Sequence, residues 1–253
     1  MSFTVAAESY DRFMGRYSSL LAPLFADFAG VAAGQRVVDV GCGPGALTTE
    51  LVRRVGPDRV AAADPSETFF AAAQQRHPEV TVRHAAAEQL PFDDGAFDAA
   101  LAQLVVHFMA DPVGGLREMS RVTRHGGVVA ACVWDHEGDR GPLSLFWRAA
   151  HQLDADVADE AGLAGAREGH LEQLFDEAGL GAIEATTLTI STEHRSFDDW
   201  WEPYTLGVGP AGSYAASLDT AHQTELREVC RTMLPMAPFV LTANAWAARS
   251  VAV

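Results

Sequence analysis

The sequence predicts an α/β fold in which helices cover both faces of a mostly parallel sheet. Short apolar segments alternate with segments whose apolar side chains recur at helical spacing, a pattern typical of βαβ units. The short segments are hydrophobic along almost their whole length, as strands buried on both faces must be. The length of 253 residues suits one such domain with insertions.

The alternation is most regular in the first half of the chain. One or two helices are expected over residues 10–28, because the apolar side chains there recur every three or four positions. Further along, Ser66 is a suitable N-cap and Glu67 falls in the first turn of the helix that follows it. The expected strands are 36–40, 59–63, 80–83, 97–103 and 127–134, and the expected helices are 46–55, 66–76 and 112–122.

The pattern is less regular after residue 134. Two late strands are expected at 182–192 and 239–247, with helical segments at 143–153, 171–178 and 197–234. The segment between the two late strands is far longer than a hairpin loop of about 2–5 residues, so it is expected to pack as a cap. The predicted organisation is a single domain of residues 1–253, with a cofactor-binding core at 34–134 and a cap from 1–30, 138–169 and 196–236.

Composition excludes several classes of protein. The chain has 34 acidic residues against 18 Lys plus Arg, a net charge of −16, which disfavours nucleic acid and anionic membrane surfaces as partners. The cysteines, Cys42, Cys132 and Cys230, are isolated and odd in number, so neither a disulfide framework nor a metal site is expected. No apolar run reaches the ~18 residues of a membrane span. A cytoplasmic location is therefore expected.

A glycine-rich turn lies between the first strand and the first helix of the regular region. Gly41, Gly43 and Gly45 let the backbone turn tightly and let a ligand approach closely. The next strand ends at Asp64, a position from which a carboxylate can hold the paired hydroxyls of a ribose. Together the two features predict a ligand that contains adenosine, bound at the carboxyl ends of the strands.

The charge of Asp39 distinguishes between two such ligands. The loop also fits the dinucleotide fingerprint, but a carboxylate two residues before Gly41 would repel the pyrophosphate of NAD. S-adenosylmethionine carries an ammonium and a sulfonium, and both suit an acid at this position. An NAD-dependent oxidoreductase remains the alternative, although the chain has no Tyr-x-x-x-Lys pair and no lysine at all. A non-catalytic protein that binds S-adenosylmethionine is a further alternative.

The same residues resemble those of class I S-adenosylmethionine-dependent methyltransferases. The similarity runs from VVDVGCGPG through AAADPSE, AAAEQLPF and FDAALAQLVVHF to EMSRVTRHGG, and it is closest to the small-molecule group that includes ubiquinone and menaquinone biosynthesis enzymes. It implies a Rossmann-like seven-stranded sheet with one antiparallel strand near the edge. It also implies methyl transfer to a small organic molecule, with the acceptor atom and the oligomeric state open.

The resemblance assigns roles to individual residues. One departure is Ala86, which stands where an Asp commonly binds the adenine amine, so Glu88 or a backbone carbonyl would take that role. The N-terminal segment resembles a lid, in which Arg16 would pair with the cofactor carboxylate and Tyr10 would close over the methionine end. The expected cofactor-binding residues are Tyr10, Arg16, Asp39, Gly41, Gly43, Gly45, Asp64, Pro65, Ala87, Glu88 and Gln103.

Residues just beyond two strands are candidates for the chemistry of the acceptor. His107 follows the strand that ends at Gln103 and is the candidate catalytic base, with His136 as a weaker second candidate. The densest aromatic group, Trp200, Trp201 and Tyr204, would either line an acceptor pocket or bury the cap against the core, and Phe146 and Trp147 share this ambiguity.

Overall fold

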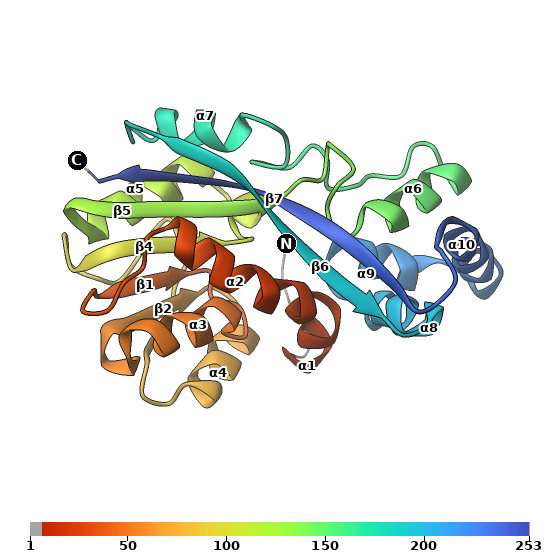
Figure 1. Ribbon diagram of the computed structural model, residues 1–253, viewed down its shortest axis with the longest axis horizontal. Helices are drawn as coiled ribbons and strands as arrows, with labels where there is room; N and C mark the ends of the chain where they lie inside the picture. The colour runs from red at the N-terminus through yellow and green to blue at the C-terminus, as the bar shows by residue number, and fades with distance from the viewer. Residues whose placement is uncertain (1–6, 253) are drawn as a thin grey trace.

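The computed structural model describes residues 7–252, which form a seven-stranded sheet with helices on both faces (Figure 1). The strand order is β3-β2-β1-β4-β5-β7-β6. The strands are β1 Val37–Val40, β2 Val60–Asp64, β3 Thr81–His84, β4 Phe97–Gln103, β5 Thr123–Trp134, β6 Glu184–His194 and β7 Phe239–Val251. The α-helices are α1 Ala7–Tyr10, α2 Arg16–Phe28, α3 Ala46–Val55, α4 Glu67–Arg76, α5 Pro112–Val122, α6 Ser144–Leu153, α7 His170–Glu177, α8 Phe197–Trp201, α9 Gly209–Ser217 and α10 Thr220–Met233. A π-helix, η1 Asp11–Gly15, and three 3-10 helices, η2 Pro57–Arg59, η3 Val106–Phe108 and η4 Glu202–Leu206, complete the set.

The sheet confirms the predicted topology. Strands β1 to β5 pair in parallel, whereas β7 runs antiparallel to both of its neighbours, β5 and β6, and lies one place from the edge. The two late strands are hydrogen-bonded neighbours, and their pairing begins at His194 and Phe239. The chain therefore leaves the sheet after β6 and returns directly opposite, so everything between these two residues is an insertion at one end of the sheet.

Alternating side chains of the strands fill two cores. In β1, Val37 packs in the core that contains Leu51 of α3, while Val38 packs in the core that contains Met119 of α5 and Phe175 of α7. This is the period of two that a strand buried on both faces requires. Helices α2 and α3 thus cover one face, and α5 and α7 cover the other.

Four helices gather beyond the end of the sheet where β5 finishes and β7 begins (Figure 1). We call α6, α8, α9 and α10, together with η4, the helical cap. Its aromatic side chains pack closely, since Phe146 of α6 stacks on Tyr204 of η4 with ring centroids 4.5 Å apart. Phe13 of η1 meets the same Tyr204 ring edge-on at 5.2 Å. Of the N-terminal segment predicted for the cap, α2 instead packs against α3 and β6, and residues 1–6 lie outside the described residues.

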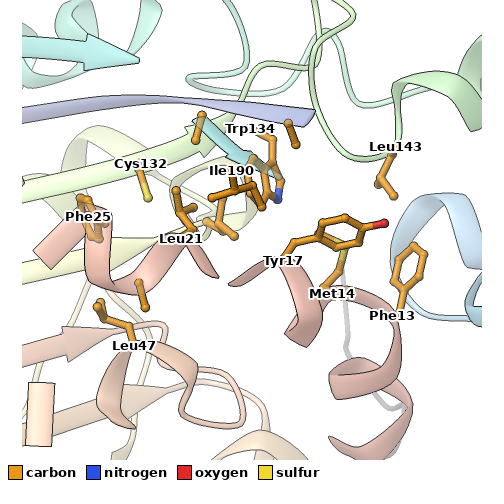
Figure 2. Close-up of a cluster of buried hydrophobic side chains, with 14 of the residues drawn as sticks. Phe13, Met14, Tyr17, Leu21, Phe25, Leu47, Cys132, Trp134, Leu143 and Ile190 are labelled. Atoms are coloured by element: carbon orange, nitrogen blue, oxygen red, sulfur yellow. The ribbon is translucent and has the colours of Figure 1, made fainter. Parts of the chain in front are cut away.

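The core beneath α2 continues into the region between the sheet and the cap. Figure 2 shows Trp134, at the end of β5, beside Ile190 of β6, with Tyr17, Phe13 and Leu143 toward the cap. This apolar continuity fixes the cap relative to the carboxyl ends of the strands, where ligands of open α/β sheets bind.

The cap is less regular than the sequence pattern predicts. Residues 197–234 were expected to be helical throughout, but the structure divides them among α8, η4, α9 and α10. Gly207 and Gly209 both adopt positive φ, at 70° and 63°, and these conformations end one helix and redirect the chain into the next.

We predict that truncation in the core beneath α3 destabilises the fold strongly. Leu51→Ala removes a side chain that is 0% exposed and should lower the free energy of unfolding by about 2–5 kcal/mol. The matched control, Leu20→Ala in α2, changes a side chain that is 45% exposed and should cost less than about 0.5 kcal/mol. Urea unfolding of both variants tests this, and equal losses would contradict the described packing.

Candidate active site

A cavity of about 510 Å³ lies at the carboxyl ends of β1, β2 and β4. It is bounded by the glycine-rich turn after β1, the turn after β2, the residues after β4 and the side chain of Tyr10. Nine of the eleven residues expected to bind the cofactor line it: Tyr10, Asp39, Gly41, Gly43, Asp64, Pro65, Ala87, Glu88 and Gln103.

The glycine-rich turn is held tightly against the neighbouring strand. The backbone N–H groups of Gly41 and Cys42 donate to the carbonyl oxygen of Ala63, at 2.8 and 3.0 Å. Gly41 has a φ of +69°, and a Cβ there would lie 2.3 Å from Cγ2 of Val105. Both the conformation and the space therefore require glycine at this position.

Asp64 braces the same turn from the end of β2. Its Oδ2 accepts a hydrogen bond from the backbone N–H of Gly43 and its Oδ1 accepts one from Ser66, both at 2.8 Å. The carboxyl is buried, and burial raises its pKa above the usual value. Asp64 thus connects the two turns and still lines the cavity, the position expected for a ribose-binding acid.

Asp39 and Gln103 present oxygen atoms to the cavity from adjacent strands. Asp39 is 1% exposed, its Oδ2 accepts from the Thr48 hydroxyl at 2.6 Å, and burial raises its pKa from 3.8 to about 7. Gln103 donates through Nε2 to the carbonyl oxygen of Ser18 at 3.2 Å, while its buried Oε1 has no partner within the described part of the chain. A buried carboxyl and an amide oxygen that has no donor favour a cationic group, such as an ammonium.

Aromatic and acidic side chains complete the wall. The Tyr10 ring meets Phe69 edge-on with centroids 5.1 Å apart, and burial raises the pKa of Tyr10 to about 12, so its hydroxyl stays protonated. Glu88 lies at the opposite wall, where its Oε1 accepts from the backbone N–H of Asp111 at 3.1 Å.

A second, smaller cavity of about 40 Å³ adjoins the first. Tyr10, Leu104 and Phe108 line both cavities and therefore form the wall between them. Leu104 has a φ of +61°, a left-handed conformation that costs a non-glycine residue roughly 1–2 kcal/mol. His107 and His136 line the smaller cavity, with ring centroids 5.9 Å apart.

Both histidines are neutral at pH 7. Burial lowers the pKa of His107 well below 6.5 and lowers that of His136 to about 4. A neutral imidazole has a lone pair that can accept a proton, and His107 stays a candidate base beside the cofactor cavity.

Two of the expected cofactor residues lie elsewhere. Gly45 has a φ of +98° and forms the N-terminal boundary of α3, so it shapes the turn from outside the cavity lining. The structure also does not bring Arg16 to the cavity. Its guanidinium contacts Asp199 of α8 at 3.1 Å and Nδ1 of His194 at 3.2 Å, and so ties α2 to the cap and to the end of β6.

The aromatic group of the cap is core rather than pocket lining. Trp200, Trp201 and Tyr204 are at most 4% exposed and belong to the continuous core beneath α2, together with Phe146 and Trp147. None of these five lines either of the two cavities. The structure therefore favours the packing interpretation for this group.

Sequence reasoning missed several residues that line the cavities. Phe69 and Met109 belong to segments that the sequence predicts as a helix and a loop, without any signal that their side chains face a ligand. Glu160 lies in the acidic segment 154–169, where nothing in the pattern distinguishes one acid from its neighbours. Among residues 7–252, no cluster of histidine, cysteine, aspartate or glutamate would hold a metal ion.

The fold and the site resemble those of class I S-adenosylmethionine-dependent methyltransferases. Comparison with known proteins confirms that resemblance: residues 38–131 match the family model described as a methyltransferase domain. These residues include the glycine-rich turn, Asp64 and the whole of β4, so the matched domain contains most of the cavity wall.

Individual relatives agree with the domain match. An uncharacterised methyltransferase of Mycobacterium tuberculosis is 35% identical over 140 residues, which cover 55% of this chain and 54% of the relative. A demethylmenaquinone methyltransferase of Clavibacter sepedonicus is 29% identical over 191 residues, covering 73% of this chain and 77% of the relative. The chain spans about half the length of the first of these relatives.

A solved structure shows the same fold. The geranyl diphosphate C-methyltransferase of Streptomyces coelicolor, solved with S-adenosyl-L-homocysteine, superposes with a TM-score of 0.54 at 19% identity and covers 94% of this chain and 80% of its own. The methyltransferase matches do not support the alternative of an NAD-dependent oxidoreductase. Within residues 7–252, no helix is both long and apolar enough to cross a membrane.

We predict that binding of S-adenosyl-L-homocysteine depends on the ionisation of Asp39. Since its pKa is about 7, the carboxyl is mostly protonated at pH 5.5 and mostly ionised at pH 7.5. An ammonium is attracted to the ionised form, so affinity should rise by about tenfold across this interval. Calorimetric titrations at several pH values measure the change.

Asp39→Asn is the control for this titration, because the amide oxygen can still accept from Thr48. The variant should bind more weakly at pH 7.5 and lose most of the dependence on pH. An unchanged pH dependence in Asp39→Asn would assign the titration to another group of the cavity, such as Asp64.

Proposed function

We propose that this protein transfers a methyl group from S-adenosylmethionine to a small organic molecule. The observation that carries the proposal is the pairing of two kinds of group in one cavity. Asp64 offers a carboxylate at the end of β2, and Asp39 and Gln103 offer acceptors suited to an ammonium. A nucleoside that carries an amino acid requires both.

The chain would bind the cofactor through named groups. Asp64 would hold the ribose hydroxyls, Asp39 and Gln103 would hold the ammonium, and Tyr10 would close the cavity at the methionine end. The region around Ala87 and Glu88 would flank the adenine. When bound, S-adenosylmethionine supplies an electrophilic methyl group on a sulfonium. The protein's contribution is to hold donor and acceptor at attack distance and to exclude water.

His107 is the proposed base for an acceptor that must lose a proton. It lies beyond the wall formed by Leu104 and Phe108, and its neutral imidazole would take a proton from a hydroxyl or an acidic carbon. The smaller cavity, where His107 lies, would receive the acceptor. The names of the relatives, which include menaquinone and geranyl diphosphate methyltransferases, support a small and largely apolar substrate.

We also propose a cytoplasmic location, supported by three free and buried cysteines that show no pairing. The acidic composition supports a partner other than nucleic acid.

The test of cofactor binding is a calorimetric titration with S-adenosylmethionine, S-adenosyl-L-homocysteine and NADH. We expect the first two to bind and NADH not to bind. Asp64→Asn should weaken binding by about tenfold or more, because a charge-assisted hydrogen bond contributes about 1.5–3 kcal/mol. Asp58→Asn, at an exposed acid of η2, is the matched control and should leave affinity unchanged. Binding of NADH alone would overturn the proposal.

The proposed base has its own prediction. With an acceptor identified by screening against labelled methyl donor, His107→Ala should lower kcat by about 10²–10⁴-fold while leaving cofactor affinity within a factor of three. His125→Ala, at an exposed imidazole of β5, controls for the loss of a histidine. Near-full turnover by His107→Ala would exclude the role of base.

A further inference from the structure

The smaller cavity is lined by buried polar atoms that lack partners. Among the residues that the structure describes, Nδ1 of His107, Nε1 of Trp134 and Nε2 of His136 are buried without a hydrogen bond, and all three side chains line this cavity. A buried polar group left unpaired costs about 1–3 kcal/mol. Three such atoms around one small space can all be paired by one ligand group.

A buried carboxyl lines the same space. Glu160 is 3% exposed, and its Oε2 accepts a hydrogen bond from Nε1 of Trp147 at 2.9 Å. Burial raises the pKa of Glu160 to about 7, so near neutrality the carboxyl can be protonated and can donate or accept. The Trp134 indole, in contrast, can only donate.

These chemistries disfavour charged ligand groups. An ammonium has no lone pair for the Trp134 N–H and would leave that donor unpaired. A carboxylate would meet the Glu160 carboxyl with no cation beside it, since both histidines are neutral. A hydroxyl accepts from the Trp134 N–H and donates to an imidazole nitrogen or to Glu160. It can therefore pair with these buried polar groups without bringing a net charge.

We propose that this cavity binds a neutral hydroxyl group of the methyl acceptor, with Trp134 and Glu160 as specificity-determining residues. The inference rests on the proposed methyl transfer, since it assigns the acceptor's polar group to the cavity beside the cofactor site. The volume of about 40 Å³ holds only a few non-hydrogen atoms. The rest of the acceptor therefore extends past Leu104 and Phe108 toward the larger cavity.

Apolar side chains surround the polar set. Phe13 and Met14 of η1, Leu143 before α6, and Val208 and Pro210 at the start of α9 line the same cavity. Figure 2 shows Phe13, Met14 and Leu143 on the cap side of Trp134. An apolar body with a single hydroxyl, as in a phenol or a terpenoid alcohol, matches such a lining.

The experiment uses four probes of similar size with the protein saturated in S-adenosyl-L-homocysteine: phenol, toluene, benzylamine and benzoate. Calorimetry gives affinities, and ¹H–¹⁵N spectra follow the indole N–H of Trp134, assigned by its loss in Trp134→Phe. We expect phenol to bind most tightly and to shift this signal. Trp134→Phe should weaken the binding of phenol about fivefold. Trp246→Phe removes another unpaired indole N–H, one outside the cavity, and should leave the affinity for phenol unchanged.

Glu160→Gln separates a neutral from a charged ligand. The amide can still accept from Trp147 and can still bind a hydroxyl, so phenol affinity should stay within about threefold. The inference would be overturned if benzylamine bound most tightly and lost its affinity in Glu160→Gln. It would also be overturned if toluene bound as tightly as phenol, or if phenol did not bind. These failures leave binding of S-adenosyl-L-homocysteine intact, whereas failure of the proposed function removes it.

Discussion

The site depends on the contact between the glycine-rich turn and the ends of its neighbouring strands. Two consecutive N–H groups, of Gly41 and Cys42, share the carbonyl oxygen of Ala63, and the Val105 side chain occupies the space where a Cβ on Gly41 would lie. The turn therefore cannot move away from β2 without losing hydrogen bonds, nor toward Val105 without overlapping its side chain. Because Asp64 accepts from Gly43 within the same turn, the position of the proposed ribose-binding acid is fixed by the same contacts.

The electrostatics of the cavity follow from this packing. Asp39 and Asp64 are both buried, and burial raises the pKa of each; the negative charge of Asp64 raises the pKa of Asp39 further. A cationic ligand relieves that cost by pairing with the carboxylate. The loop thus uses backbone geometry to admit a ligand and buried acids to select its charge, whereas a loop that binds pyrophosphate relies on N–H groups alone.

Local patterns in the sequence predicted the sheet, its helices and most of the residues that line the larger cavity, because a strand–turn–helix with glycines and an acid is encoded within about thirty residues. Contacts between distant segments were not predictable in this way. Arg16 was assigned to the cofactor carboxylate, yet it pairs with Asp199, 183 residues further along the chain. Glu160 is one acid among many in its segment, and only the folded cap places it beside His107 and His136. Residues 197–234 divide into several helices at Gly207 and Gly209, and the cap they form packs on α6 through Tyr204 and Phe146.

The wall between the two cavities separates two kinds of chemistry. In the larger cavity, Asp39 and Asp64 favour a cationic ligand group. In the smaller cavity, burial keeps His107 and His136 neutral. Had either histidine been charged, its field would have acted on Asp39 and Asp64 across a poorly screened interior. Leu104 forms part of that wall just after β4, with a φ of +61°, and its backbone N–H donates to the carbonyl oxygen of Cys132 of β5. Strain at this position is tolerated because the sheet on both sides of β4 fixes the backbone, and the same rigidity would hold an acceptor that reaches past Leu104 and Phe108 in line with the donor.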